Sequence, residues 1–105
     1  MTPKIVRDQI PDLIAESGRT PVYSIVSTED AIAGLETKLS EELAEYLADH
    51  SLEEMADLLE VMHGILYHKG ITWDQLEEVR LIKRAERGGF ERRLLLTDIL
   101  SPEQT

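Results

Sequence analysis

The chain has 105 residues, a formal net charge of −10 at pH 7, 42% hydrophobic residues and only 5% aromatic residues. A chain this negative repels nucleic-acid backbones and anionic membranes, so we expect neither a nucleic-acid polymer nor a membrane as its partner. The absence of cysteine excludes disulfides and thiolate zinc sites and fits a reducing compartment. No segment approaches the ~20 apolar residues of a bilayer span, and no apolar stretch of a secretory signal follows the first residues. These features predict one soluble, cytoplasmic domain comprising residues 1–105.

The first predicted element is a short helix from about Asp8 to Ser17. Pro11 is tolerated in its first turn, and Gly18 can end it. A long helix is predicted next, roughly from Glu29 to Ala48, because apolar residues recur there at helical spacing. That stripe consists of Ile32, Leu35, Leu39, Leu43 and Leu47.

The third predicted helix runs from Leu52 to Lys69. Ser51 followed by Glu54 is typical of a capping box at its start, and Gly70 follows a basic last turn. Its apolar stripe, which we expect to be core, consists of Met55, Leu58, Leu59, Met62 and Leu66. The connection to the preceding helix, about residues 49–51, is so short that it predicts an antiparallel hairpin.

The last predicted helix runs from Trp73 to Arg87 and ends before Gly88. Two segments, Val22 to Val26 and Phe90 to Leu96, are ambiguous and are compatible with short strands that pair with each other. Since helix signals dominate, the predicted fold class is all-α. A small helical chain gains stability by sharing apolar faces with another subunit, so we expect a homodimer or a larger assembly such as a tetramer.

The hairpin carries two matched pairs of acids. Glu42 and Glu45 are spaced i, i+3 on the first arm, and Glu54 and Asp57 have the same spacing on the second. At about 100° per residue, each pair lies to the same rotational side of its own apolar stripe. Each pair also lies at a similar distance from the turn. The four carboxylates are therefore predicted to converge on one patch.

Four crowded carboxylates repel one another and favour a bound cation. Hard oxygen ligands without histidine or cysteine suit Mg²⁺, with Mn²⁺ as a second choice, better than zinc. Two other interpretations stay open. The acids can be a solvated helix face, and Glu54 can serve only as the reciprocal member of the Ser51 capping box.

Basic residues gather toward the end of the chain, where six of the eleven lysines and arginines lie between Arg80 and Arg93. Four of them follow i, i+3, i+4, i+7 spacing and form one stripe suited to phosphate groups. These are Arg80, Lys83, Arg84 and Arg87. The alternative is an ordinary helix end, where cations are favoured by the helix dipole. Arg7 is a further phosphate-binding candidate. The alternative is that Arg7 and Asp8 form an ion pair or a helix cap.

The spacing of these motifs resembles a known superfamily. Residues 41–45 (EELAE) and 54–57 (EMAD) resemble the EExxE…ExxD signature of the all-α nucleoside triphosphate pyrophosphohydrolases, the MazG-like superfamily. Residues 4–11 (KIVRDQIP) and 83–90 (KRAERGGF) resemble the opening and closing motifs of its small phosphoribosyl-ATP pyrophosphohydrolase-like members. The resemblance covers residues 4 to about 94.

The resemblance implies a MazG-like helical domain and a role for each matching residue. Glu41 matches the position that orients or deprotonates the attacking water. Lys83 and Arg87 match phosphate-binding residues of an NxxKxxxR pattern, in which Arg80 replaces the asparagine, and this departure puts the usual recognition of sugar or base in doubt. The matches to the Mg²⁺ ligands are Glu42, Glu45, Glu54 and Asp57. Lys38, just before the first acids, and Arg7 complete the candidate substrate-binding set.

The predicted reaction is Mg²⁺-dependent attack of water on a nucleoside triphosphate or a close analogue, releasing a monophosphate and pyrophosphate. The implied role is the removal of non-standard or surplus nucleotides, by analogy with the family. One alternative is a true phosphoribosyl-ATP pyrophosphohydrolase of histidine biosynthesis. Another is a non-catalytic helical module for oligomerisation or interaction, in which the acids only solvate the surface.

Overall fold

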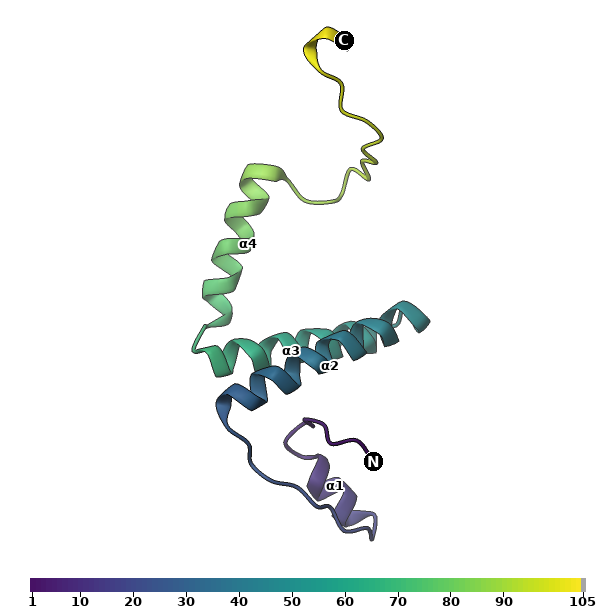
Figure 1. Ribbon diagram of the computed structural model, residues 1–105, viewed down its shortest axis with the longest axis vertical. Coiled ribbons are helices and arrows are strands. Elements are labelled where there is room, and N and C mark those ends of the chain that lie inside the picture. Colours follow the sequence, from purple (N-terminus) through teal and green to yellow (C-terminus); the bar gives the residue numbers. More distant parts are fainter. Residues whose placement is uncertain (105) are drawn as a thin grey trace. The chain divides into compact units, whose positions relative to one another are not determined.

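The computed structural model describes residues 1–104 and is all-helical (Figure 1). Its elements are α1 (Ile10–Glu16), α2 (Thr28–Asp49), α3 (Leu52–Lys69), α4 (Trp73–Arg87) and a short 3₁₀ turn, η1 (Pro102–Gln104). Within residues 1–104 there is no strand, so neither ambiguous segment forms one. The all-α prediction is confirmed. The four helices were expected with the observed bounds to within two residues at each end.

The chain divides into two compact units, Met1–Trp73 and Asp74–Thr105. The first contains α1, α2 and α3. The second contains the rest of α4 and the segment that follows it. In the part of the chain that the structure describes, no helix has both the length and the apolar composition of a membrane span.

Side-chain caps fix both arms of the hairpin in place. Ser27 Oγ accepts the Asp30 N–H at 3.1 Å at the start of α2, and Ser51 Oγ accepts the Glu54 N–H at 3.2 Å at the start of α3. The helix α3 ends at Gly70, whose φ of 71° is the left-handed conformation that favours glycine. Local sequence signals therefore determine where these two helices begin and end.

The helices α2 and α3 lie side by side and antiparallel (Figure 1). His50, in the left-handed conformation, and Ser51 make the whole connection, and the Ser51 N–H donates to Asp49 Oδ1 at 3.0 Å. Farther along, a Cβ at Gly64 would lie only 3.2 Å from Leu35 Cδ1, so glycine lets the two helices approach closely there. The predicted antiparallel hairpin is thus present.

The interior of a single chain is small. Among the described hydrophobic residues, only Val61 is buried. Five members of the two predicted core stripes are between 39% and 60% exposed, namely Leu43, Leu47, Met55, Leu59 and Met62. The expectation that they form a core is not met within one chain, because a pair of helices can cover only the facing side of each partner.

The N-terminal segment packs directly on α2. Ile5 lies so close to Gly34 that any Cβ at this position would collide with its side chain. From this contact the chain continues past Arg7 into α1. Glycine at position 34 therefore brings the residues around Arg7 to the hairpin.

Candidate metal centre

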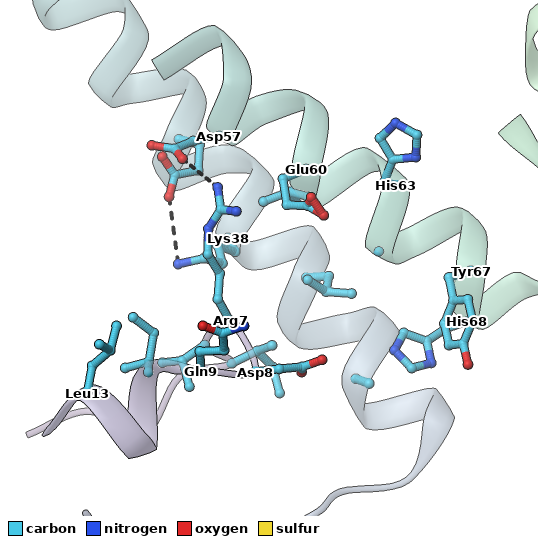
Figure 2. A pocket seen from close by; sticks show the side chains of 18 residues that line it. Arg7, Asp8, Gln9, Leu13, Lys38, Asp57, Glu60, His63, Tyr67 and His68 are labelled. Atoms are coloured by element: carbon cyan, nitrogen blue, oxygen red, sulfur yellow. Dashed lines mark hydrogen bonds and ion pairs between the residues drawn. The ribbon is translucent and has the colours of Figure 1, made fainter. Parts of the chain in front are cut away.

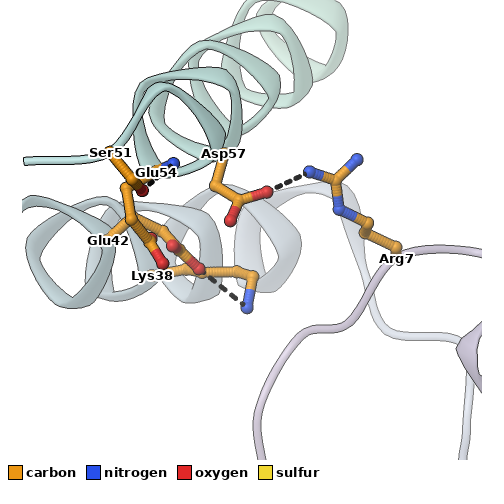
Figure 3. A network of polar contacts seen from close by, with 6 residues as sticks. All are labelled: Arg7, Lys38, Glu42, Ser51, Glu54 and Asp57. Atoms are coloured by element: carbon orange, nitrogen blue, oxygen red, sulfur yellow. Dashed lines mark hydrogen bonds and ion pairs between the residues drawn. The ribbon is translucent and has the colours of Figure 1, made fainter. Parts of the chain in front are cut away.

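Three acids from both arms of the hairpin meet at one place. Glu42 on α2 and Glu54 and Asp57 on α3 each offer one carboxylate oxygen, and these oxygens lie within 4.8 Å of one another (Figure 3). Two oxygens that bind one Mg²⁺ at about 2.1 Å are at most about 4.2 Å apart. The three acids can reach this spacing by small side-chain rotations, so their arrangement fits one divalent cation.

The burial of these acids sets them apart from an ordinary acidic surface. Glu42 is only 8% exposed and is the one buried polar or charged residue among those described. Its Oε2 atom, and that of Glu54, are buried without a hydrogen-bond partner in residues 1–104. A buried carboxylate oxygen without a partner is costly. A cation in the cluster would supply the missing interaction for both.

The backbone leaves the Glu54 carboxylate available. Its N–H donates to Ser51 Oγ, which is one half of the predicted capping box. The reciprocal half is replaced, because the Ser51 N–H donates to Asp49 instead. Capping therefore does not account for the Glu54 side chain.

Partial burial, together with the neighbouring acids, raises the pKa of Glu54 from its ordinary value near 4.5 to about 7. Partial burial is the largest cause, followed by the charge of Glu45, a hydrogen bond that the protonated carboxyl group can make with Glu45, the charge of Asp49 and a similar hydrogen bond with Glu42. Near neutral pH, this carboxyl group is thus close to half protonated when no cation is bound.

The two remaining predicted acids lie at the margin. Glu45 is exposed, yet its carboxylate is close enough to Glu54 to affect that pKa. It is outside the group of three whose oxygens fall within 4.8 Å. Glu41 is exposed on α2 and makes no ion pair or side-chain hydrogen bond in residues 1–104. The structure therefore brings together three of the four proposed ligands and places the fourth beside them.

Two cations partly neutralise the cluster. Arg7 Nη2 donates to Asp57 Oδ1 at 2.6 Å, and Lys38 Nζ lies 3.6 Å from Glu42 Oε1 (Figure 3). Lys38 reaches Glu42 from one turn earlier on α2, whereas Arg7 comes from a segment 50 residues away from Asp57. Both were candidates for phosphate binding, and the structure places both beside the acids.

A pocket of about 890 Å³ opens from the cluster. It lies between the N-terminal segment and the α2–α3 hairpin, with Glu42 and Asp57 in its wall, and extends past Glu60 toward Tyr67 and His68 (Figure 2). Glu60 was not among the predicted site residues. It continues the i, i+3 series of Glu54 and Asp57, and this spacing could have indicated that it lies on the same face of α3.

The predicted basic stripe belongs to α4, in the second unit. Arg80 pairs with Glu77, and Arg84 Nη2 donates to Glu91 Oε1 at 2.6 Å. These contacts lower the pKa of both carboxyl groups, chiefly through the hydrogen bonds. Two members of the stripe, Lys83 and Arg87, have no ion pair within residues 1–104.

Comparison with known proteins identifies a relative that matches part of the chain. A protein of Mycolicibacterium smegmatis, described only as uncharacterized, is 51% identical over 45 residues. The matched region covers 43% of this chain and 46% of that protein, so it spans less than half the length of the relative. No family model and no solved structure matches the chain.

Proposed function

We propose that this chain is a Mg²⁺-dependent nucleoside triphosphate pyrophosphohydrolase of the MazG-like kind, which releases a nucleoside monophosphate and pyrophosphate. One observation carries the proposal. Three carboxylates from two helix arms converge within 4.8 Å, and the most buried of them, Glu42, keeps an oxygen without a hydrogen-bond donor. The resemblance of residues 41–45 and 54–57 to the EExxE…ExxD signature supports the same proposal.

The residues present fit a hard divalent cation. Glu42, Glu54 and Asp57 would hold it, with Glu45 close enough to join through a change of side-chain rotamer. Such an ion, when bound, polarises phosphate oxygens and lowers the pKa of water. Mn²⁺ would be accepted by the same ligands.

The other residues act on the substrate and its proton. Glu41 immediately precedes Glu42 on α2, and its exposed, unpaired carboxylate can accept a proton from the attacking water. The 890 Å³ pocket is within the usual size range of small-molecule sites, roughly 300–1,000 Å³. Arg7 and Lys38 lie at its acidic end, where they can bind phosphate oxygens. Lys83 and Arg87 are assigned to the pyrophosphate, in keeping with the resemblance.

The proposal includes an assembly of at least two copies. The exposed apolar residues of the hairpin are regularly spaced, with Met55, Leu59 and Met62 at i, i+4, i+7 on α3. Covering such a stripe with a second copy would stabilise both chains. Leu59→Lys is expected to convert the assembly to a monomer in sedimentation velocity, whereas Leu13→Lys, a change on exposed α1, leaves it intact.

The decisive experiment measures pyrophosphate release from a panel of NTPs, dNTPs and phosphoribosyl-ATP, with and without Mg²⁺. Glu42→Gln and Asp57→Asn should each reduce turnover at least about 100-fold, because each removes a ligand of the essential ion. Both should also raise the stability of the metal-free protein by relieving repulsion. Glu36→Gln, which removes an exposed acid elsewhere on α2, is the matched control and should retain activity.

The panel also separates the alternatives. Turnover confined to phosphoribosyl-ATP would assign the chain to histidine biosynthesis. Absence of turnover on every substrate, with Mg²⁺ and Mn²⁺, would favour the non-catalytic helical module. Full activity of both variants would show that the assigned site is wrong.

A further inference from the structure

Two of the three acids of the centre are paired with cations. Arg7 donates to Asp57 at 2.6 Å, and Lys38 lies 3.6 Å from Glu42. Both cations line the pocket that opens from the cluster (Figure 2). The charges that would bind a phosphate are thus the same charges that occupy the candidate metal ligands.

We propose that Arg7 is an exchangeable counter-ion, which holds Asp57 in the metal-free protein, yields it to the divalent cation, and then binds a phosphate group in the pocket. This inference deepens the proposed function. It rests on the proposed metal site but not on the hydrolysis of any substrate.

The geometry favours Arg7 over Lys38 for this exchange. Lys38 is one turn from Glu42 on the same helix, so the two stay neighbours whatever binds. Arg7 comes from a non-helical segment, and the side chains of Arg7 and Asp57 are 52% and 37% exposed. A half-exposed pair can separate at little cost, and its partners can then take new ones.

The chemistry of the two groups fits the same sequence of events. A divalent cation and the Arg7 guanidinium group both interact with the single negative charge of Asp57 and repel each other, so the two compete for this carboxylate. Once released, a guanidinium group offers paired N–H donors in the planar arrangement that matches phosphate oxygens. Arg7 already lies in the pocket wall, next to the cluster where a metal-bound phosphate would sit.

The N-terminal segment should therefore respond to metal. Its attachment to the hairpin includes the Ile5 contact at Gly34 and the Arg7–Asp57 ion pair. When the metal binds Asp57, the segment loses the ion pair and keeps the Ile5 contact. A phosphate ligand then restores an anchor for Arg7.

The first test is calorimetric titration of Mn²⁺ into the full chain without substrate. Arg7→Gln should bind Mn²⁺ about two- to fivefold more tightly than wild type, the effect expected for losing a partly exposed competing ion pair. Arg7→Lys keeps the charge and should stay close to wild type. Arg19→Gln is the control for net charge, because Arg19 bonds to Ser17 and not to the cluster, and it should leave the affinity unchanged.

The second test measures hydrogen exchange of the amides in residues 4–13. In wild type, Mg²⁺ should speed exchange, and adding inorganic pyrophosphate should slow it again while free Mg²⁺ is buffered at a saturating level, so that the pyrophosphate does not simply remove the metal. In Arg7→Gln, exchange should be fast from the start and respond to neither addition. A purely structural role for Arg7 would not produce this reversal.

The outcomes separate the two proposals. If wild type, Arg7→Gln and Arg19→Gln bind Mn²⁺ equally and the amides do not respond, the exchange is refuted while the metal site stands. If no variant binds Mn²⁺ or Mg²⁺, the metal site and the exchange are both refuted. Tighter binding by Arg7→Gln alone, with the amide reversal in wild type, supports the exchange.

Discussion

The α2–α3 hairpin and α4 are both strongly charged, but their charged side chains are arranged in opposite ways. In the hairpin, like charges gather, and the pKa of Glu54 rises to about 7, mainly through partial burial and the nearby charge of Glu45. In α4, opposite charges pair locally, so that Arg80 lowers the pKa of Glu77 and Arg84 lowers that of Glu91.

This difference separates a candidate site from an ordinary surface. Local pairs of opposite charge are common on helices and need no function to explain them. Crowded acids with buried, unpartnered oxygens cost free energy, so they need a compensating ligand. Within α4, Lys83 and Arg87 are the two stripe members without an ion pair in residues 1–104, although both are exposed.

Kinetic measurements on variants of α4 test that distinction, and among the tests of the comparison they should show the largest effect. Lys83→Gln and Arg87→Gln should each lower kcat/KM for a triphosphate about 10- to 100-fold, since each removes a charge assigned to phosphate. Arg80→Gln and Arg84→Gln remove cations that already have acidic partners and should change it less than about twofold. Steady-state kinetics on the four variants gives the answer. Equal losses in all four variants would contradict the distinction between cations with and without acidic partners.

The next effect follows from the hairpin's raised pKa. Below pH 7, Mn²⁺ must displace a proton from Glu54, so its affinity should fall by up to about tenfold per pH unit between pH 7 and 5. Titration calorimetry at several pH values measures this slope. Glu54→Gln should weaken binding and flatten the pH dependence, while the exposed neighbour variant Glu53→Gln should keep the wild-type slope.

The same group affects stability with a defined sign. Because its pKa is raised in the folded state, folded Glu54 binds more protons than the unfolded chain between pH 4.5 and 7. Its contribution to the metal-free protein is therefore fully present below about pH 4.5 and is lost as pH rises through 7. The melting temperature of the metal-free wild type should fall relative to that of Glu54→Gln as pH rises through 7. If the difference between the two proteins did not change with pH, the raised pKa would be contradicted.

The smallest expected effect concerns the caps that hold the hairpin. Ser51→Ala removes the acceptor of the Glu54 N–H and should lower the free energy of unfolding by about 1 kcal/mol. Ser24→Ala, in the exposed segment before α2, is the control and should have almost no effect. Chemical denaturation measures both. Equal values would mean that the turn contributes less to the hairpin than its hydrogen bonds suggest.

The hairpin could be predicted from the sequence because its signals are local. Apolar spacing, a two-residue turn and the Ser51 cap act within one or two helical turns, and all are present in the structure. The same spacing did not reveal which apolar residues would be covered. Leu59 and Leu58 are adjacent in the predicted stripe, yet Leu59 is exposed and Leu58 partly buried, because only one side of α3 faces α2.

Contacts between distant segments were beyond such reasoning. Arg7 was a candidate for phosphate, with pairing to Asp8 as the alternative, but it pairs with Asp57, 50 residues away. Nothing in periodicity encodes that pairing, which depends on Ile5 packing against Gly34. The role of the Glu54 side chain was equally undetermined by the sequence, since a capping box was possible. In the structure the Ser51 N–H donates to Asp49 instead.

The burial of Glu42 has a practical consequence for protein engineering. Only it and Val61 are buried among the described residues, so one of the two best-shielded side chains is an acid that folding alone would not choose. Directed evolution for heat resistance would tend to replace it with a neutral or apolar residue. Libraries of this protein should therefore be screened with a divalent cation present, so that gains in thermal tolerance do not silently discard the binding centre.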